Sequence, residues 1–218
     1  MAHPPVRFLL DYISPYAYLA WQRLPALAAR QGRAVEPVPV LLAGVLNATG
    51  NIGPAEVAAK RGYLFKQTFR IAHDFGVPFA PPPTHPFNPL LALRVTAAVE
   101  DVESRSRLVS ALYASAWGGG KGAESPEAVG AAIEAAGLDA QALLAAAQTQ
   151  PVKDRVRQNT EAAVAAGAFG VPTYLADDEL FFGVDSLGHL EQFLRGEDPL
   201  TPEAVERWRT LPASASRR

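Results

Sequence analysis

Residues 6–18 read Val6-Arg7-Phe8-Leu9-Leu10-Asp11-Tyr12-Ile13-Ser14-Pro15-Tyr16-Ala17-Tyr18. The short apolar and aromatic run over 6–12 predicts a β-strand. Ser14 and Pro15 then predict a helix start. The Ser14 hydroxyl can accept a hydrogen bond from a first-turn amide, and Pro15 lacks an N–H that would stay unpaired at the first helical position. The stretch therefore predicts a strand that leads directly into a helix.

The rest of the chain predicts a second strand, a long helical block, and a closing β-hairpin with a helix. Pro25 predicts a kink inside the first helix. The prolines of the second strand allow it to lie only at a sheet edge or in irregular pairing. The predicted elements are helix 16–31, strand 34–42, a glycine-rich loop 43–54, helices 55–75, 90–103, 105–117, 126–136, 139–147 and 152–166, loop and strand 170–176, strand 179–183 and helix 185–194.

The order of these elements predicts an α/β fold with a helical insertion. Residues 1–42 and 167–196 together are expected to form one small α/β domain. Residues 43–166 form the inserted helical domain in this interpretation, and residues 197–218 form a C-terminal tail, because they are polar and interrupted by proline.

Composition excludes several classes of function. The chain has 218 residues, 49% of them hydrophobic, and a formal net charge of −2, which argues against disorder and against nucleic-acid binding driven by bulk positive charge. It has no cysteine, which excludes disulfide scaffolds, thiolate metal sites and a protein thiol nucleophile. Without a signal-peptide pattern or an apolar run long enough for a membrane span, we expect a soluble, cytoplasmic protein.

Ser14 is the first candidate for chemistry. A helix N-terminus offers unpaired amides and the positive end of the helix dipole, and a hydroxyl there can donate to an anion held against those amides. The simpler alternative is that Ser14 only caps the helix. No G-x-S-x-G context and no neighbouring histidine in the sequence support a nucleophilic serine. A chemical role for Ser14 is therefore expected to be anion stabilisation.

Pro172 is the second candidate, because it lies between a glycine and a strand in Val171-Pro172-Thr173. A cis peptide bond before Pro172 would turn the N–H and C=O of Val171 away from the sheet and towards a ligand. The alternative is an ordinary proline at a strand entry.

Asp185, Asn51 and Lys60 are weaker candidates. Asp185 opens the last predicted helix and could bind a ligand ammonium group or cap the helix. Lys60 could pair with a ligand carboxylate, although an isolated lysine is more often a solvated charge. The four histidines show no metal-ligand spacing, so we predict no metal site.

These residues together resemble a known family. Ser14-Pro15-Tyr16-Ala17 stands where thioredoxin-fold disulfide oxidoreductases carry C-x-x-C, and Val171-Pro172-Thr173 is similar to their cis-proline loop. Serine in place of the first cysteine, with a long helical insertion, resembles the DsbA-like 2-hydroxychromene-2-carboxylate isomerases and the related kappa-class glutathione transferases. Further motifs match the same group: Thr49-Gly50-Asn51, Lys60-Arg61-Gly62-Tyr63, Pro86-Phe87-Asn88, Leu93-Arg94 and Phe182-Gly183-Val184-Asp185.

The resemblance implies a thioredoxin-like fold, glutathione as cofactor, a small aromatic substrate and a homodimer. By that similarity Ser14 would donate to the glutathione sulfur, and the backbone of Val171, before Pro172, would pair with the cysteinyl backbone. The Val184 amide and Asp185 would hold the γ-glutamyl end. Asn51 and Lys60 would contact the peptide and its glycyl carboxylate.

The implied activity is isomerisation of 2-hydroxychromene-2-carboxylate to trans-o-hydroxybenzylidenepyruvate, in the degradation of aromatic compounds such as naphthalene. A borrowed thiolate would add reversibly to a conjugated carbon and permit rotation or ring opening. Two alternatives stay open: a kappa-type glutathione transferase or peroxidase, and a non-catalytic thioredoxin-fold binding module.

Overall fold

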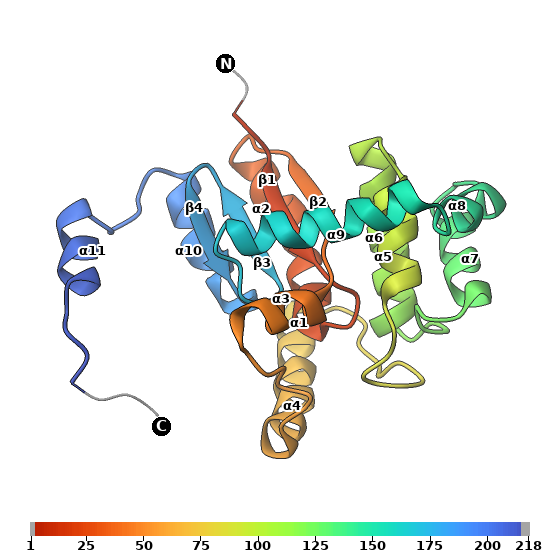
Figure 1. Ribbon diagram of the computed structural model, residues 1–218, viewed down its shortest axis with the longest axis horizontal. Helices are drawn as coiled ribbons and strands as arrows, with labels where there is room; N and C mark the ends of the chain where they lie inside the picture. Colours follow the sequence, from red (N-terminus) through yellow and green to blue (C-terminus); the bar gives the residue numbers. More distant parts are fainter. Residues whose placement is uncertain (1–2, 215–218) are drawn as a thin grey trace.

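The computed structural model describes residues 3–214, which form one mixed β-sheet surrounded by helices (Figure 1). The strands are β1 (Val6–Leu10), β2 (Val35–Pro39), β3 (Thr173–Ala176) and β4 (Glu179–Phe182). They lie in the order β2-β1-β3-β4, with β1 parallel to β2 and antiparallel to β3, and with β3 and β4 as an antiparallel hairpin. The predicted strands at both ends of the chain are therefore confirmed as parts of one sheet.

Helices fill the connection between β1 and β2 and the much longer connection between β2 and β3. Their bounds are α1 (Pro15–Trp21), α2 (Leu24–Arg30), α3 (Leu42–Thr49), α4 (Ala58–Phe75), α5 (Leu90–Ala98), α6 (Val102–Trp117), α7 (Pro126–Ala135), α8 (Ala140–Ala146), α9 (Gln150–Ala165), the 3₁₀ turn η1 (Val184–Ser186), α10 (Leu187–Leu194) and α11 (Pro202–Arg209). Within residues 3–214, no helix combines the length and the hydrophobicity that a membrane crossing requires.

The structure corrects several predicted element bounds. The helix expected over 16–31 is two helices, and Pro25 lies in the first turn of α2 rather than at a kink. The loop expected over 43–54 is wrong in its first half, because α3 forms there, packs on α9, and ends at Gly50 with φ of 69°. The helix expected over 90–103 ends at Ala98.

The C-terminal tail also differs from the prediction, since α11 forms within it. Thr201 caps this helix by accepting a hydrogen bond from the Ala204 amide. Residues 1–2 and 215–218 lie outside the described residues. The division into a discontinuous α/β domain and an inserted helical domain stays a prediction.

The sheet is buried on both faces, as its apolar first strand requires. Phe8 and Leu10 of β1 belong to the larger core, which continues through α1 and α2 into the helical block as far as α9. Leu9 points to the other face and packs with Val38, Ala163 and neighbouring residues. Figure 1 shows α9 crossing over this second face, with α5–α8 at the β2 side of the sheet and α11 beyond β4.

The prolines of β2 explain why this strand lies at the edge of the sheet. The N and C=O groups of one strand residue point to the same side, so Pro37 and Pro39 lose no ladder bond if they face outwards. Their carbonyls indeed accept from the helical block: Arg105 Nη1 donates to Pro37 O at 3.3 Å and Asn159 Nδ2 to Pro39 O at 3.1 Å. The predicted edge position is confirmed, and side chains cover the exposed edge against further strand pairing.

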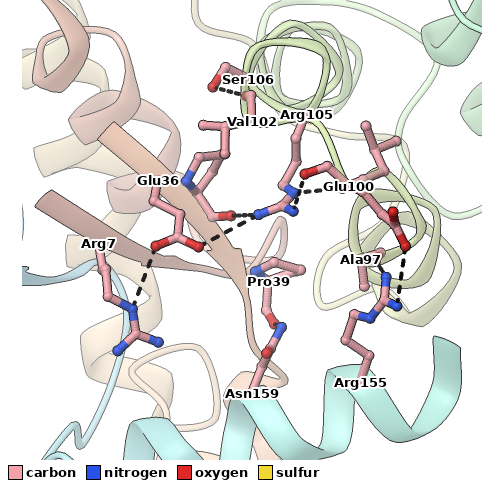
Figure 2. A network of polar contacts seen from close by, with 12 residues as sticks. Arg7, Glu36, Pro39, Ala97, Glu100, Val102, Arg105, Ser106, Arg155 and Asn159 are labelled. Atoms are coloured by element: carbon pink, nitrogen blue, oxygen red, sulfur yellow. Dashed lines mark hydrogen bonds and ion pairs between the residues drawn. The ribbon is translucent and has the colours of Figure 1, made fainter. Parts of the chain in front are cut away.

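Arg105 is the centre of this contact (Figure 2). Its side chain is 15% exposed, and it donates to Val99 O at 2.8 Å and to Glu100 O at 3.0 Å in addition to Pro37 O. Glu36 of β2 lies 4.0 Å from it. One guanidinium therefore joins the sheet edge to the connection between α5 and α6.

Replacing Arg105 should separate this edge from the helical block. Arg105→Met keeps much of the side-chain length but leaves the Val99 and Pro37 carbonyls without their donor, so we expect a loss of about 1–3 kcal/mol in the free energy of unfolding. Arg70→Met, on the exposed side of α4, is the matched control and should change stability by less than about 0.5 kcal/mol. Urea unfolding followed by circular dichroism measures both, and equal midpoints would contradict the role of Arg105.

Candidate functional site

Ser14 begins α1, and it does what the sequence predicts of an N-cap. Its backbone is extended, with φ of −93° and ψ of 113°, and its Oγ accepts from the Ala17 amide at 3.2 Å. The same hydroxyl donates across the site to Val171 O at 3.4 Å. Ser14 is 6% exposed. In capping, Ser14 Oγ acts as an acceptor. The hydroxyl hydrogen can therefore be donated either to Val171 O or to a ligand.

The loop opposite Ser14 carries the predicted cis proline. The Val171–Pro172 peptide bond is cis, which confirms the first of the two interpretations of this motif. Pro172 O accepts from the Gly183 amide at 2.9 Å, and Thr173 Oγ1 donates to Gly170 O at 2.8 Å. The loop is thereby fixed to the turn that leads out of β4.

That turn holds Val184 and Asp185. Gly183 has φ of 89°, a backbone conformation that favours glycine, and the missing Cβ leaves room for Asp185 Oδ1. Neither Asp185 nor Ser186 caps the closing helix through its side chain, so the capping alternative for Asp185 is wrong. Its exposed carboxylate lies on a turn that packs against α1 and is thus available at the same edge as Ser14.

Asn51 reaches the site from the end of α3. Its Nδ2 donates to Thr49 Oγ1 at 3.1 Å and to Phe169 O at 3.4 Å. Phe169 precedes Val171 by two residues, so Asn51 connects the α3 end to the cis-proline loop. Asn51 and Phe169 are exposed, whereas Gly170, Val171 and Pro172 of the same loop are buried.

Lys60 lies in the first turn of α4, beside a cavity of about 340 Å³. Tyr16, Pro54, Ala59, Tyr63 and Leu64 line the rest of this cavity. Tyr16 donates its hydroxyl to Gln67 Oε1 at 2.6 Å, and burial, helped by nearby Tyr63 and Asp185, raises its pKa. The cavity thus lies between α1 and α4, with an apolar wall, a neutral phenol and one cation.

The sequence-predicted residues therefore gather at one end of the sheet. Ser14 donates to Val171 O, and Pro172 O accepts from Gly183, next to Val184 and Asp185. Asn51 donates to Phe169 O at the start of the cis-proline loop. Lys60 joins them through the cavity that it shares with Tyr16. These segments are far apart in the sequence, and only the fold brings them together.

Sequence reasoning missed the groups that hold the turn before Ser14. Side chains of the helical block bind successive backbone carbonyls of this turn. Tyr113 donates its hydroxyl to Asp11 O at 3.4 Å, Trp117 donates Nε1 to Tyr12 O at 2.8 Å, and His85 Nε2 lies 3.1 Å from Ile13 O. In the sequence, Tyr113 and Trp117 look only like core residues. Both are indeed part of the core.

His85 is distant from Ser14 in the sequence, but the fold brings its ring to Ile13, the residue before Ser14. Partial burial lowers the pKa of His85, an effect that its bond to Ile13 opposes, so the ring is neutral at physiological pH. A carbonyl can only accept, so Nε2 carries the proton and Nδ1 is a bare acceptor. Nδ1 is buried and has no partner within residues 3–214. His85 contacts the residue before Ser14, and its bond to Ile13 O helps to place the turn.

The Trp117 bond should contribute measurably to stability. Trp117 is fully buried, and Trp117→Phe leaves the Tyr12 carbonyl unpaired and part of the indole volume empty, so we expect a loss of about 2–4 kcal/mol in the free energy of unfolding. Trp208→Phe is the control, because Trp208 is 76% exposed on α11. Chemical denaturation of both variants checks this expectation, which fails if the two variants have the same unfolding midpoint.

Comparison with known proteins shows the family to which the chain belongs. The family model of the DSBA-like thioredoxin domain matches residues 5–195. The chain is 31% identical over 191 residues to a 2-hydroxychromene-2-carboxylate isomerase of Sphingobium xenophagum, covering 87% of this chain and 97% of that protein. It is 30% identical over 206 residues to glutathione S-transferase kappa 1 of Rattus norvegicus, covering 88% and 91%.

Solved structures agree with the sequence relatives. A 2-hydroxychromene-2-carboxylate isomerase structure superposes with a TM-score of 0.81 at 29% identity, over 88% of this chain and 94% of that one. The predicted thioredoxin-like α/β fold with a long helical insertion is thus confirmed. The chain therefore belongs to the DSBA-like thioredoxin family and, within it, to the enzyme group of the 2-hydroxychromene-2-carboxylate isomerases.

Proposed function

We propose that this protein is a glutathione-dependent isomerase that interconverts 2-hydroxychromene-2-carboxylate and trans-o-hydroxybenzylidenepyruvate. The observation that carries the proposal is the Ser14 hydroxyl, which is held at the start of α1 against Val171 O in a chain without any cysteine. The relatives described above are named as an isomerase and as a glutathione transferase, and these names support a glutathione-related activity here.

The residues present fit the thiol end of glutathione. Bound glutathione would supply the thiolate that adds to a conjugated carbon of the substrate and leaves again. The Ser14 hydroxyl would turn from Val171 O to donate to that sulfur, while its oxygen continues to cap α1. The N-terminal amides and dipole of the helix favour a negative charge at the same place, so the protein lowers the pKa of the bound thiol.

The remaining site residues fit the polar ends of the same tripeptide. In the proposed complex the backbone of Val171, before Pro172, pairs with the cysteinyl unit. The Val184 amide and Asp185 hold the γ-glutamyl end, where the amide donates to the carboxylate and Asp185 accepts from the ammonium group. Asn51 contacts the peptide, and Lys60 pairs with the glycyl carboxylate. Asp185 and Lys60 are both exposed, so a ligand with charges at both ends can reach them without displacing protein contacts.

The cavity beside α1 supports an aromatic substrate. Its walls are mostly apolar, from Pro54, Ala59 and Leu64, with the Tyr16 and Tyr63 rings at its sides. A flat apolar ring buries its faces against such walls, whereas a purely hydrophilic substrate would lose hydration without compensation. We therefore assign this cavity to the aromatic part of the substrate.

Ser14→Ala should weaken catalysis through the thiol. Without the hydroxyl donor the pKa of bound glutathione rises and less thiolate is present, so we expect turnover to fall by about 10- to 1000-fold, the effect of losing one donor to an anion. Thiolate absorbance followed during a pH titration of the complex measures the pKa directly.

Ser106→Ala is the matched control for this experiment. Ser106 lies on α6, where its hydroxyl donates to Val102 O within the helix. This variant should keep the thiol pKa and the turnover of the wild type. An identical thiolate titration for Ser14→Ala and the wild type would contradict the proposed role, and so would an unchanged activity, which is the outcome expected of a non-catalytic binding module.

A kappa-type transferase or peroxidase is the second candidate, because the kappa-class transferase of Rattus norvegicus is 30% identical to this chain, against 31% for the isomerase of Sphingobium xenophagum. The two activities differ in the fate of glutathione. An isomerase returns it unchanged, whereas a transferase or peroxidase consumes it.

Counting free thiol during turnover separates these candidates. With the chromene carboxylate as substrate and reduced glutathione present, we expect product to accumulate while the free thiol concentration stays constant. Loss of one thiol for each product formed would assign the transferase activity and exclude the isomerase. Glutathione with boiled protein is the control for spontaneous thiol loss. The homodimer and the cytoplasmic location stay predictions of the sequence.

A further inference from the structure

Asp11 is a buried carboxylate at the junction of two site segments. It is 0% exposed and follows β1 directly. Its Oδ1 accepts from the Ile13 amide at 3.1 Å, and its Oδ2 accepts from the Leu42 amide at 2.8 Å. One side chain therefore binds the turn that carries Ser14 and the first residue of α3.

These two amides belong to two different segments of the site. Ile13 immediately precedes Ser14. Leu42 begins α3, which ends at Gly50, and the next residue, Asn51, binds the cis-proline loop at Phe169 O. The carboxylate thus sets the distance between the Ser14 turn and the helix that supports Asn51. In this geometry each amide uses a different oxygen, so both oxygens of the carboxylate serve as acceptors.

The surroundings of Asp11 make ionisation of its carboxyl group unfavourable. Tyr12 on its own segment and Tyr113 from α6 face it, and burial raises the pKa of both phenols, so they stay neutral. His85, from the connection between α4 and α5, approaches the same turn at Ile13 O as a neutral ring. The positive end of the α3 dipole, at Leu42, partly offsets the cost of a negative charge on Asp11.

No lysine, arginine or histidine within residues 3–214 forms an ion pair with Asp11. Burial raises its pKa to about 7, against the opposing effect of the Leu42, Ile13 and Tyr12 amides.

We propose that Asp11 is a positioning residue whose carboxylate form holds the Ser14 turn against α3, and whose protonation releases one of these two contacts. The carboxylic acid keeps one acceptor oxygen, but its hydroxyl group cannot both carry the proton and accept well from the facing amide. This inference rests on the proposed function for its effect on ligand binding. It has an independent consequence for stability and for the two amides themselves.

The pH dependence of stability has a definite sign. The folded state holds a proton on Asp11 up to about pH 7, whereas the unfolded state releases it near the ordinary value of 3.8. The folded protein therefore binds the extra proton across this interval, and the Asp11 contribution to stability falls as the pH rises through it. A buried group that costs stability in its ionised form is a candidate for a role in the site.

Asp11→Asn tests the inference, with Asp178→Asn in the exposed β3–β4 turn as the matched control. The asparagine side chain keeps the shape but places an NH₂ group against one of the two amides, and it does not titrate. S-methylglutathione is the binding probe, because it has no thiol that titrates between pH 5.5 and 8.

Calorimetry should show that wild type and Asp178→Asn bind S-methylglutathione about 3- to 10-fold more tightly at pH 8 than at pH 5.5. Asp11→Asn should bind with the weaker affinity at both pH values. The same pH dependence in Asp11→Asn as in the wild type would overturn the inference.

Two further measurements separate this inference from the proposed function. The urea midpoint of wild type, relative to Asp11→Asn, should fall between pH 5 and pH 7 and then level off. Amide exchange at Ile13 and Leu42 should be at least about 10-fold faster in Asp11→Asn than in wild type at pH 8, while exchange in α6 stays the same. If no protein binds the probe but both of these results hold, the glutathione proposal fails and the positioning role of Asp11 stands. If neither result is found, the positioning role is wrong.

Discussion

The hydrogen bonds to the turn between β1 and α1 are the contacts on which the site depends. A turn of a few residues cannot satisfy its own backbone, and buried carbonyls without donors are costly. Here the donors come from Tyr113, Trp117 and His85, all in the helical block between β2 and β3. The insertion therefore does more than cover the sheet, because it determines where Ser14 lies.

The same block also completes the sheet. The prolines of β2 remove donors from its outer edge, and the remaining carbonyls accept from Arg105 and Asn159 (Figure 2). The sheet edge and the Ser14 turn are thus held by neighbouring parts of one helical assembly. Because this core is continuous from β1 into α9, a change in the packing of the insertion is transmitted to the site.

Much of the site could be predicted because its members carry local signals. Ser14 with Pro15 favours a helix start through local preferences alone, and Val171-Pro172-Thr173 indicates an unusual backbone position. Asp11 carried no such signal, since an aspartate after a strand usually lies in a solvated turn. His85, Tyr113 and Trp117 were equally unmarked, because their partners lie 72, 102 and 105 residues away in the sequence.

The sequence by itself determined the properties that need only neighbouring residues or composition: the strand-to-helix turn, the edge strand with its prolines, the hairpin, and the absence of a protein thiol. The tertiary structure alone decided that residues 42–49 form a helix, where a glycine-rich loop was expected, and that Asp11 is fully buried. The reason is physical. Local conformation follows from the backbone preferences of adjacent residues, whereas burial and the choice of hydrogen-bond partner depend on which distant segments the packed core brings into contact.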